Sequence, residues 1–566
     1  MPEPFLHDAV AHPKPWLQSY PPGISPTIPA SPYSSIGALF EASCARFATR
    51  AAYTSFGKTL GYGEIERHTA HIAAWLQAQG LTKGDRVAVM MPNVLQNPIS
   101  IFAILRAGLI VVNVNPLYTP RELEHQLNDS GAKAIFVLEN FARTVQQVAP
   151  RTSLKHIIVS AMGDMLGLKG VVVNLVVRRV KKLVPQWSLP GHVPFLTVLK
   201  QGASQTLNPP SVNPADTAFL QYTGGTTGIS KGAVLTHANL LANMVQIEQW
   251  LEAAFLTKQR PEQMVLICAL PLYHIFALTV NAMIGLSTGG HNILIANPRD
   301  IPAFVKELSK IRPHIFPGLN TLFNALMNNP GFAKLDLSTL LLTLGGGMAV
   351  QKPVADRWKQ ITGSNICEGY GLSETSPVAT ANRVDSEDFT GTIGLPLPST
   401  DIDIRDEAGN SLGLGESGEI CIRGPQVMAG YWQKPEDTAN AMTADGFFRS
   451  GDIGFMDTKG YIKIVDRKKD MILVSGFNVY PNEIEEVAMS HPGVLECAAV
   501  GVSNEQSGEL VKLFVVRKDP NLTEADIRAH CAEHLTNYKR PRLIEFRDEL
   551  PKSNVGKILR KDLRET

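Results

Sequence analysis

Cysteine is scarce in this sequence, with six residues among 566. No two of them form a CxxC pair, so the sequence indicates neither a disulfide framework nor a zinc-ribbon site. Cys531 and His534 have a spacing that metal ligands use, but no second pair completes a zinc site, and we interpret them as incidental. This use of cysteine points to a reducing compartment, and we expect a cytoplasmic protein.

An excess of charge of one sign is also lacking, because 53 Lys and Arg residues stand against 52 Asp and Glu residues. This balance excludes a globally basic nucleic-acid binder. The segment Met1–Trp16 has neither a basic start nor a long apolar run, so no signal peptide is expected. One apolar stretch, Met264–Leu286, is long enough for a bilayer. It contains Pro271, His274 and Asn281, which favours a buried core over a membrane span.

A basic amphipathic segment lies between Met165 and Trp187. A helix of this kind can lie in a membrane interface, so Val171–Val184 is a candidate for peripheral contact with the inner face of the cell membrane. An ordinary surface helix packed on the core explains the pattern equally well, and both interpretations stay open. On a helical wheel the basic face holds Asn174, Arg178, Lys181 and Lys182, and the apolar face holds Val172, Val173, Val176, Val177, Val180, Leu183 and Val184.

From about residue 35 to residue 465, short β-rich runs alternate with amphipathic helical patterns. This alternation predicts layered α/β subdomains built around largely parallel sheets. The expected strands include Arg86–Met90, Ala134–Leu138, His156–Ser160 and Asn292–Ile295, and the expected helices include Tyr62–Gln79 and Pro120–Asn128.

The pattern changes after residue 400, where closely spaced strands are joined by short turns. Such spacing indicates a small antiparallel sheet or β-barrel-like subdomain. The charged run Asp466–Asp470 then precedes a small α+β pattern, so we place a domain boundary near Lys469. The expected domains are residues 1–468 and 469–566. The expected strands of the subdomain are Asp401–Ile404, Gly418–Arg423, Ile453–Met456 and Tyr461–Ile464.

The strongest chemical signal is the glycine-rich segment Tyr222–Gly232, of sequence YTGGTTGISKG, which follows an expected strand, Ala218–Tyr222. Its glycines allow the backbone to wrap an anion with its N–H groups. Three threonines and Ser230 add hydroxyl donors, and Lys231 adds a positive charge. The segment therefore predicts a polyphosphate-binding loop.

Three sharper motifs fail on their context. A Walker A loop needs Gly-Lys-Ser/Thr, but Lys231 is followed by Gly232. The match of Gly228–Gly232 to GxSxG is not a nucleophile elbow, because an elbow leads straight into a helix and Gly232–Thr236 is an expected strand. The match of Gly413–Gly418 to GxGxxG likewise leads into a strand, which excludes a dinucleotide fingerprint.

Further motifs follow the glycine-rich segment in a fixed order, and together they resemble those of the adenylate-forming enzymes, within them the bacterial long-chain fatty-acyl-CoA ligases. The resemblance is collinear from about residue 35 to the end. The segment Asp445–Ser450 reads Asp-Gly-Phe-Phe-Arg-Ser where the family often has Asn-Gly-Trp-Leu-His-Thr, which leaves the chain-length preference open. The other motifs are Leu270–His274, Gly345–Gly347, Glu368–Thr375, Asp445–Lys469 and Pro551–Lys557.

The resemblance implies roles for individual residues. Lys557 bridges the attacking carboxylate and the α-phosphate, Glu374 holds Mg²⁺, and His274 shapes the acyl pocket. With Thr227 these are the catalytic candidates, and Lys469 is the implied hinge of a mobile C-terminal domain. The implied nucleotide-binding residues are Thr223, Gly224, Gly225, Thr226, Thr227, Gly228, Lys231, Gly345, Gly346, Gly347, Glu368, Gly369, Tyr370, Gly371, Thr375, Asp452 and Arg467.

The implied reaction has two halves: a fatty acid and ATP give acyl-AMP and pyrophosphate, and coenzyme A then gives acyl-CoA and AMP. An apolar tunnel for the acyl chain is expected near Phe276, Ala277 and Gly318–Thr321. A homodimer is implied by the resemblance alone. The alternatives are a ligase for a medium-chain or aryl acid, a fatty-acyl-AMP ligase that loads a carrier protein, a luciferase-like oxidase, and a nucleotide-binding or membrane-surface regulatory protein without catalysis.

Overall fold

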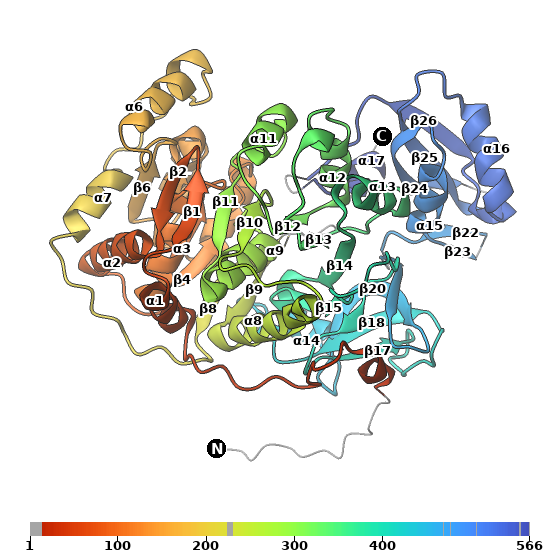
Figure 1. Ribbon diagram of the computed structural model, residues 1–566, viewed down its shortest axis with the longest axis horizontal. Helices are drawn as coiled ribbons and strands as arrows, with labels where there is room; N and C mark the ends of the chain where they lie inside the picture. The colour runs from red at the N-terminus through yellow and green to blue at the C-terminus, as the bar shows by residue number, and fades with distance from the viewer. Residues whose placement is uncertain are drawn as a thin grey trace.

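The structure is a computed structural model that describes residues 14–223, 230–467, 469–475, 477–504, 507–553 and 556–564. Figure 1 shows a large N-terminal domain and a small C-terminal domain at one end of the molecule, each of mixed helix and strand. This arrangement confirms the predicted α/β class with a large and a small domain. The glycine-rich segment lies outside the described residues between 224 and 229.

An eight-stranded sheet carries the two strands that flank the glycine-rich segment. In spatial order its strands are β19 (Gly430–Tyr431), β9 (Lys231–Thr236), β8 (Thr217–Thr223), β4 (Ile110–Asn113), β3 (Arg86–Met90), β5 (Ala134–Leu138), β6 (His156–Ser160) and β7 (Val193–Pro194). The strands from β8 to β7 pair in parallel, whereas β9 pairs antiparallel with β8. The GxSxG match therefore leads into a strand, β9, and not into a helix, as the sequence predicted.

A nine-stranded sheet lies beside it. In spatial order its strands are β16 (Leu395–Pro396), β15 (Val378–Ala381), β14 (Ile366–Gly371), β13 (Leu342–Gly345), β12 (Ile315–Gly318), β10 (Val265–Cys268), β11 (His291–Leu294), β1 (Ala51–Ser55) and β2 (Lys58–Gly61). The run from β14 to β1 is parallel. In the register of β13 and β14, Gly345 lies opposite Glu368. Because the two strands are parallel, their carboxyl ends lie at the same edge of the sheet.

Helices pack on both sheets, and one hydrophobic cluster contains side chains from each of them. Local signals set the helix ends. In α4, Thr119 and Glu122 exchange capping hydrogen bonds at the start, and Gly131 adopts φ +60° at the end. The helices of this region are α1 (Ile36–Arg46), α2 (Tyr62–Ala78), α3 (Gln96–Arg106), α4 (Pro120–Ser130), α5 (Ala142–Val148), α7 (Phe195–Gly202), α8 (His237–Glu252), α9 (Ile275–Ala277), α10 (Ile284–Thr288), α11 (Ile301–Leu308), α12 (Asn320–Met327), α13 (Lys352–Thr362) and α14 (Pro435–Ala441).

A four-stranded antiparallel sheet forms the predicted third subdomain. Its order is β17 (Asp401–Arg405), β18 (Gly418–Arg423), β20 (Phe448–Met456) and β21 (Ile462–Arg467). Among the described residues these strands form an open sheet rather than a closed barrel. The expected strand Ile453–Met456 is only the second half of β20. The prediction began too late because Gly451, at φ +72°, interrupts the alternation of apolar residues. Asp452 and Arg467 are partners in the β20–β21 register.

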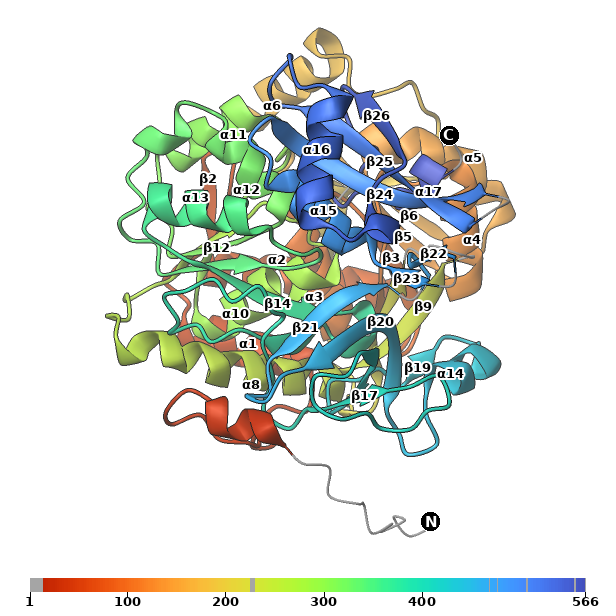
Figure 2. The same ribbon diagram turned by 90° about the vertical axis from the view of Figure 1, so that its right-hand side faces the viewer.

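The C-terminal domain has its own sheet and its own core. The strands are β22 (Ile472–Val474), β23 (Phe477–Val479), β24 (Val494–Asn504), β25 (Gly508–Arg517) and β26 (Leu543–Arg547), and the helices are α15 (Pro481–Met489), α16 (Glu524–His534) and α17 (Arg560–Arg564). A hydrophobic cluster of residues between Ile472 and Phe546 fills this domain. Figure 2, viewed onto this domain, shows β20 and β21 beside it.

The amphipathic segment forms a shorter helix than the sequence predicted. The helix α6 spans Leu168–Leu175 and continues as a π-helical turn to Val180. It stops there because Lys182 adopts φ +49° and Pro185 cannot donate a backbone hydrogen bond. None of the helices in the described part of the chain combines the length and the apolar character that a membrane crossing requires. The stretch Met264–Leu286 is divided among β10 and several short helices in the core.

Candidate functional site

A cavity of about 1600 Å³ lies between the two domains. Its walls come from the ends of β8 and β14, from β20 and β21, and from the C-terminal segment around α17. One part of the lining is polar and the other is apolar. The predicted site residues found in the described lining are Thr223, Lys231, His274, Gly345, Gly346, Gly347, Glu368, Gly369, Tyr370, Gly371, Glu374, Asp452, Arg467, Lys469 and Lys557.

The pairing of β20 with β21 brings Asp452 and Arg467 together, and Tyr370 reaches Asp452 from β14. Arg467 Nε lies 3.1 Å from Asp452 Oδ1, and Tyr370 Oη donates a hydrogen bond to Asp452 Oδ2 at 2.7 Å. Burial raises the pKa of Tyr370 well above its ordinary value, and the Asp452 charge adds to the effect. Asp452 is thus an oriented anionic acceptor on the cavity wall, suited to hydroxyl donors.

Lys557 enters this wall from the C-terminal domain. Burial lowers its pKa to about 7, and the repulsion of Arg467 adds to this shift while Asp452 opposes it. His274 is half-buried nearby, and desolvation, followed by the Lys557 charge, lowers its pKa to about 4. His274 is therefore neutral near pH 7. The main-chain carbonyl of Gly556, the neighbour of Lys557, accepts a hydrogen bond from Thr321 Oγ1 at 3.1 Å.

Glu374 is held in the cavity lining by Tyr431, a residue that sequence reasoning did not identify. Tyr431 Oη donates to Glu374 Oε1 at 2.8 Å, and burial raises the pKa of Glu374. Lys231 forms an ion pair with Asp437 and lies 5.3 Å from the centre of the Tyr431 ring. Tyr431 and Asp437 belong to β19 and α14, distant in sequence from both partners, so no spacing in the sequence signals these contacts.

The glycine segment Gly345–Gly347 forms a close-packed part of the wall. A Cβ atom on Gly346 would lie 3.0 Å from the Phe276 ring and 3.2 Å from the Gly369 carbonyl oxygen. Glu368 Oε1 accepts a hydrogen bond from Val350 N at 2.9 Å, and burial raises the pKa of Glu368 to about 8. Glu368 therefore fixes the backbone that follows the glycines.

Of the remaining candidates, one is described by the structure and the others are not. Thr375 is fully buried, and its Oγ1 donates to the Pro377 carbonyl oxygen, so it supports the turn after β14. The candidates Gly224, Gly225, Thr226, Thr227 and Gly228 lie outside the described residues.

The chemistry of Glu374 fits a magnesium ion. Its carboxylate is a hard oxygen donor on the cavity wall, and Tyr431 orients one of its oxygens. The basic side chains of Lys231, Arg467 and Lys557 line the same cavity. This set of charges suits a polyphosphate accompanied by a divalent cation.

The apolar part of the cavity suits a long hydrocarbon chain. Of the predicted lining positions, Phe276 and residues 319–321 line the cavity, whereas Ala277 and Gly318 are not part of its lining. Other apolar lining residues come from α8, from the π-helical turn Leu278–Met283 and from the loops beside β15 and β16. Sequence reasoning missed them because they have no recognisable spacing. They include Ile247, Trp250, Leu251, Val280, Val384, Ile393 and Leu397.

Comparisons with known proteins agree with this geometry. A family model described as "AMP-binding enzyme" matches residues 40–432, and one described as "AMP-binding enzyme C-terminal domain" matches residues 483–557. A long-chain-fatty-acid–CoA ligase of Yersinia pestis is 53% identical over 98% of each chain. The ATP-bound MatB of Rhodopseudomonas palustris is similar in structure, with a TM-score of 0.78, 28% identity and coverage of 94% of this chain and 98% of that one. The anthranilate CoA ligase AuaEII in complex with anthranoyl-AMP has a TM-score of 0.83, 25% identity and coverage of 94% and 97%.

Proposed function

The chain belongs to the AMP-binding enzyme family, and we propose that it is a long-chain fatty acid–CoA ligase that uses ATP, Mg²⁺ and coenzyme A. The observation that carries this proposal is one cavity that is lined both by basic and carboxylate side chains and by a group of apolar residues. The charged side chains suit a nucleoside triphosphate, and the apolar residues suit an acyl chain. The full-length similarity to long-chain-fatty-acid–CoA ligases supports the same conclusion.

In the first half-reaction the fatty acid carboxylate attacks the α-phosphate of ATP, and pyrophosphate leaves. Lys557, when protonated, places a positive charge where negative charge moves from the carboxylate to the phosphate. Asp452 accepts hydrogen bonds from the ribose hydroxyls, and Arg467 holds Asp452 in place. Glu374 would hold Mg²⁺, which would neutralise part of the phosphate charge.

In the second half-reaction the thiol of coenzyme A attacks the acyl carbon, and AMP leaves. The cavity contains Lys557 from the C-terminal domain, so this domain must withdraw to admit a second large substrate. We propose Lys469 as the hinge and 469–566 as the moving unit. Rotation there would remove Lys557 from the cavity and present another face of the domain.

Pyrophosphate release tests the proposal when it is measured with carboxylic acids from acetate to oleate, with and without coenzyme A. We expect the highest kcat/KM with long-chain acids, and AMP and acyl-CoA together only when coenzyme A is present. A preference for short or aromatic acids would overturn the substrate assignment. Acyl-AMP that accumulates and does not react with coenzyme A would instead indicate a carrier protein as acceptor.

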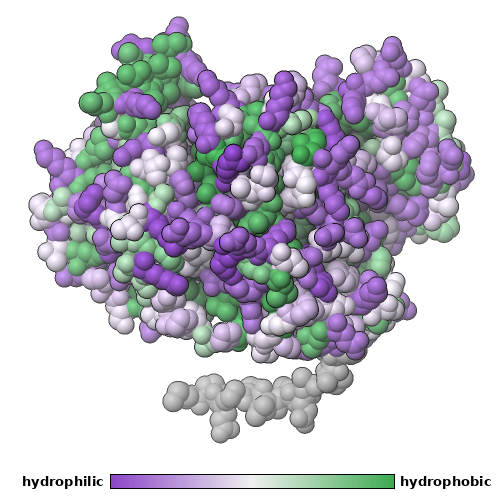
Figure 3. All heavy atoms as spheres, in the orientation of Figure 1, coloured by the Kyte–Doolittle hydropathy of each residue, from purple (hydrophilic) through white to green (hydrophobic). Residues whose placement is uncertain are grey.

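The structure also supports peripheral binding to a membrane through α6. Figure 3 shows apolar side chains gathered over the part of the surface where Figure 1 places α6. Leu168 is 92% exposed, and the neighbouring exposed side chains are apolar or basic. The helix is fixed to the body by Gly170, where an added Cβ atom would lie 1.9 Å from the Gly163 carbonyl oxygen. The exposed apolar residues are Val171, Val172, Leu175, Val180 and Leu183, and the exposed basic residues include Lys169, Arg179, Lys181 and Lys182.

We propose that this surface binds anionic bilayers, because apolar side chains gain by burial and the surrounding cations attract lipid phosphates. Flotation with vesicles containing an anionic phospholipid tests this proposal. Leu168→Asp should abolish flotation, whereas Leu256→Asp, at an exposed leucine elsewhere, should leave it unchanged. Equal flotation of both variants would refute the assignment. The homodimer stays a prediction, which light scattering coupled to size-exclusion chromatography tests.

A further inference from the structure

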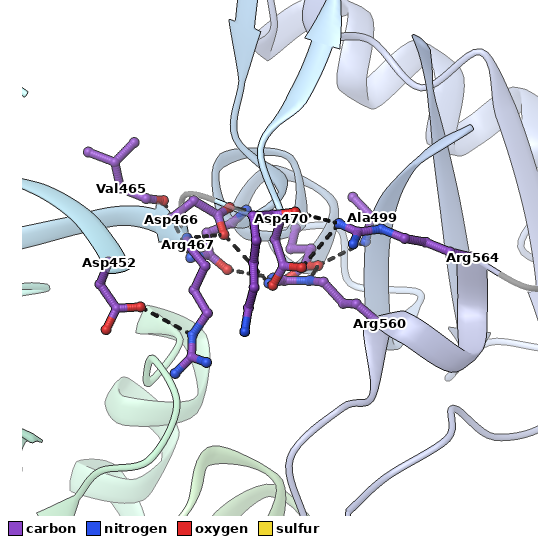
Figure 4. A network of polar contacts seen from close by, with 11 residues as sticks. Asp452, Val465, Asp466, Arg467, Asp470, Ala499, Arg560 and Arg564 are labelled. Carbon is purple, nitrogen blue, oxygen red and sulfur yellow. Dashed lines mark hydrogen bonds and ion pairs between the residues drawn. The ribbon is translucent and has the colours of Figure 1, made fainter. Parts of the chain in front are cut away.

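A buried polar network joins chain segments on the two sides of Lys469 (Figure 4). Asp466, near the end of β21, has a fully buried side chain. Its Oδ2 accepts a hydrogen bond from the backbone N–H of Asn482 at 2.9 Å, and its Oδ1 lies 3.6 Å from Arg560 Nη1. Asn482 Nδ2 donates to the Val465 carbonyl oxygen at 3.3 Å. We refer to Val465, Asp466, Asn482 and Arg560 as the hinge clasp.

Within the C-terminal domain, Arg560 is held firmly. Its Nε and Nη2 donate to the two carboxylate oxygens of Glu485 at 3.1 and 2.8 Å, and Nη2 also donates to Asn482 Oδ1 at 2.6 Å. Glu485 in turn accepts from Ala499 N at 2.8 Å. Arg560 begins α17 and follows Lys557 by one short turn of chain, so the position of Arg560 constrains that of Lys557.

We propose that Asp466 is a positioning residue for the adenylation half-reaction, because it fixes the C-terminal domain in the orientation that holds Lys557 in the cavity. The inference rests on the proposed ligase function. Asp466 touches none of the reacting groups in this proposal. It acts through Asn482 and Arg560, and Lys557 carries out the chemistry.

The geometry makes this contribution specific to one orientation. Val465 and Asp466 precede the proposed hinge, whereas Asn482 and Arg560 follow it, so a rotation at Lys469 breaks the contacts between the two pairs. The contacts of Arg560 with Glu485 and with Asp470, whose Oδ2 lies 3.5 Å from Arg560 Nη1, lie within the moving unit and persist. Burial raises the pKa of Asp466 to about 6, while the attraction of Arg560 and the N–H groups of Asn482 and Arg467 oppose this shift. The carboxylate is charged above that pH, and of these partners only the Arg467 N–H, at 2.7 Å from Oδ1, stays with Asp466 when the domain rotates.

The test compares the two half-reactions in the full-length protein. In Asp466→Ala, kcat for pyrophosphate release without coenzyme A should fall about ten- to hundredfold, the range for losing hydrogen bonds to a charged group. KM for ATP should change little, because the nucleotide contacts of the N-terminal domain remain. Thioester formation from supplied acyl-AMP and coenzyme A should be unchanged or faster. Asp466→Asn, which keeps an acceptor for the Asn482 N–H, should be intermediate.

Asp470→Ala is the matched control. Asp470 lies near the same arginine, but it lies on the C-terminal side of Lys469 and moves with Arg560. This variant should therefore keep the wild-type ratio of the two half-reaction rates. An equal change of ratio in Asp466→Ala and Asp470→Ala would overturn the proposal.

Two further outcomes would also overturn it: an equal loss of both half-reactions in Asp466→Ala, which indicates a general structural role, or no loss in either. Hydrogen exchange gives a readout independent of catalysis, because the amide of Asn482 should exchange faster in Asp466→Ala than in the wild type. If Asp466→Ala does not fold, Asp466→Asn carries the same comparison. Failure of the wild type to form acyl-CoA from any acid would refute the proposed function, while the exchange result would still decide the clasp.

Discussion

Lys557 should lose its charge near neutral pH, and the rate of adenylation should fall as it does. Desolvation of the ammonium group, with repulsion from Arg467, lowers the pKa of Lys557 from 10.5 to about 7. The charged form is therefore present below pH 7 and disappears as the pH rises. Because the proposed role of Lys557 requires the positive charge, kcat/KM for ATP should fall over the same range.

The structure sets the size of the effect. With a pKa of about 7, roughly half of the free enzyme carries a protonated Lys557 at pH 7, about one-tenth at pH 8 and about one-hundredth at pH 9. A lysine with its ordinary pKa would stay charged throughout this interval. The expected decline is thus about tenfold per pH unit above pH 8.

The assay is the initial rate of pyrophosphate release at subsaturating ATP, with magnesium in excess, a long-chain fatty acid and no coenzyme A. Lys557→Arg should be slower but independent of pH up to 9, because a guanidinium stays charged. Lys552→Arg is the control, since Lys552 pairs with Glu496 at 2.6 Å, and it should keep the wild-type profile. A wild-type kcat/KM that stays constant from pH 6.5 to pH 9 would refute the assigned pKa or the need for the charge.

Three other changes test separate parts of the structure. Tyr431→Phe removes the donor that orients Glu374, so the magnesium concentration for half-maximal activity should rise about tenfold, and an unchanged magnesium titration would contradict this role. Val280→Trp should narrow the apolar part of the cavity and lower kcat/KM about fourfold for each methylene displaced, so oleate should lose more than octanoate; equal losses would place Val280 away from the chain. Phe136→Ala, in fully buried β5, should lower the free energy of unfolding by about 3–5 kcal/mol in urea denaturation, whereas Leu256→Ala at an exposed site should change it by less than about 0.5 kcal/mol. Similar values for these two variants would show that β5 is not part of the cooperative core.

Local patterns in the sequence predicted local elements well. The strand Ala134–Leu138 has five consecutive apolar residues, which in a parallel sheet covered on both faces are all buried, and the structure has this strand with the predicted bounds. The prediction was less accurate where the pattern was interrupted. Because Gly451 interrupts the alternation, the sequence predicted only the second half of β20. The helical wheel of Val171–Val184 predicted neither the early end of α6 nor the exposure of many of its apolar residues.

The sequence by itself determined which chemical groups are available: a glycine-rich segment with Lys231, the carboxylates Glu374 and Asp452, and a C-terminal Lys557. It also determined the alternation of strands and helices, because that depends on neighbours along the chain. Only the tertiary structure decided the partners of these groups. Register between β20 and β21 sets Arg467 against Asp452, and domain packing desolvates Lys557.

The hinge clasp depends on the same distinction. Asp466 and Arg560 lie far apart in the sequence, and from the sequence each would be expected to be a charged residue exposed to solvent. In the folded chain Asp466 has lost all contact with water and faces Arg560 across the proposed hinge. Burial and charge compensation are properties of what packs around a side chain, so they follow from distant segments that no spacing rule connects.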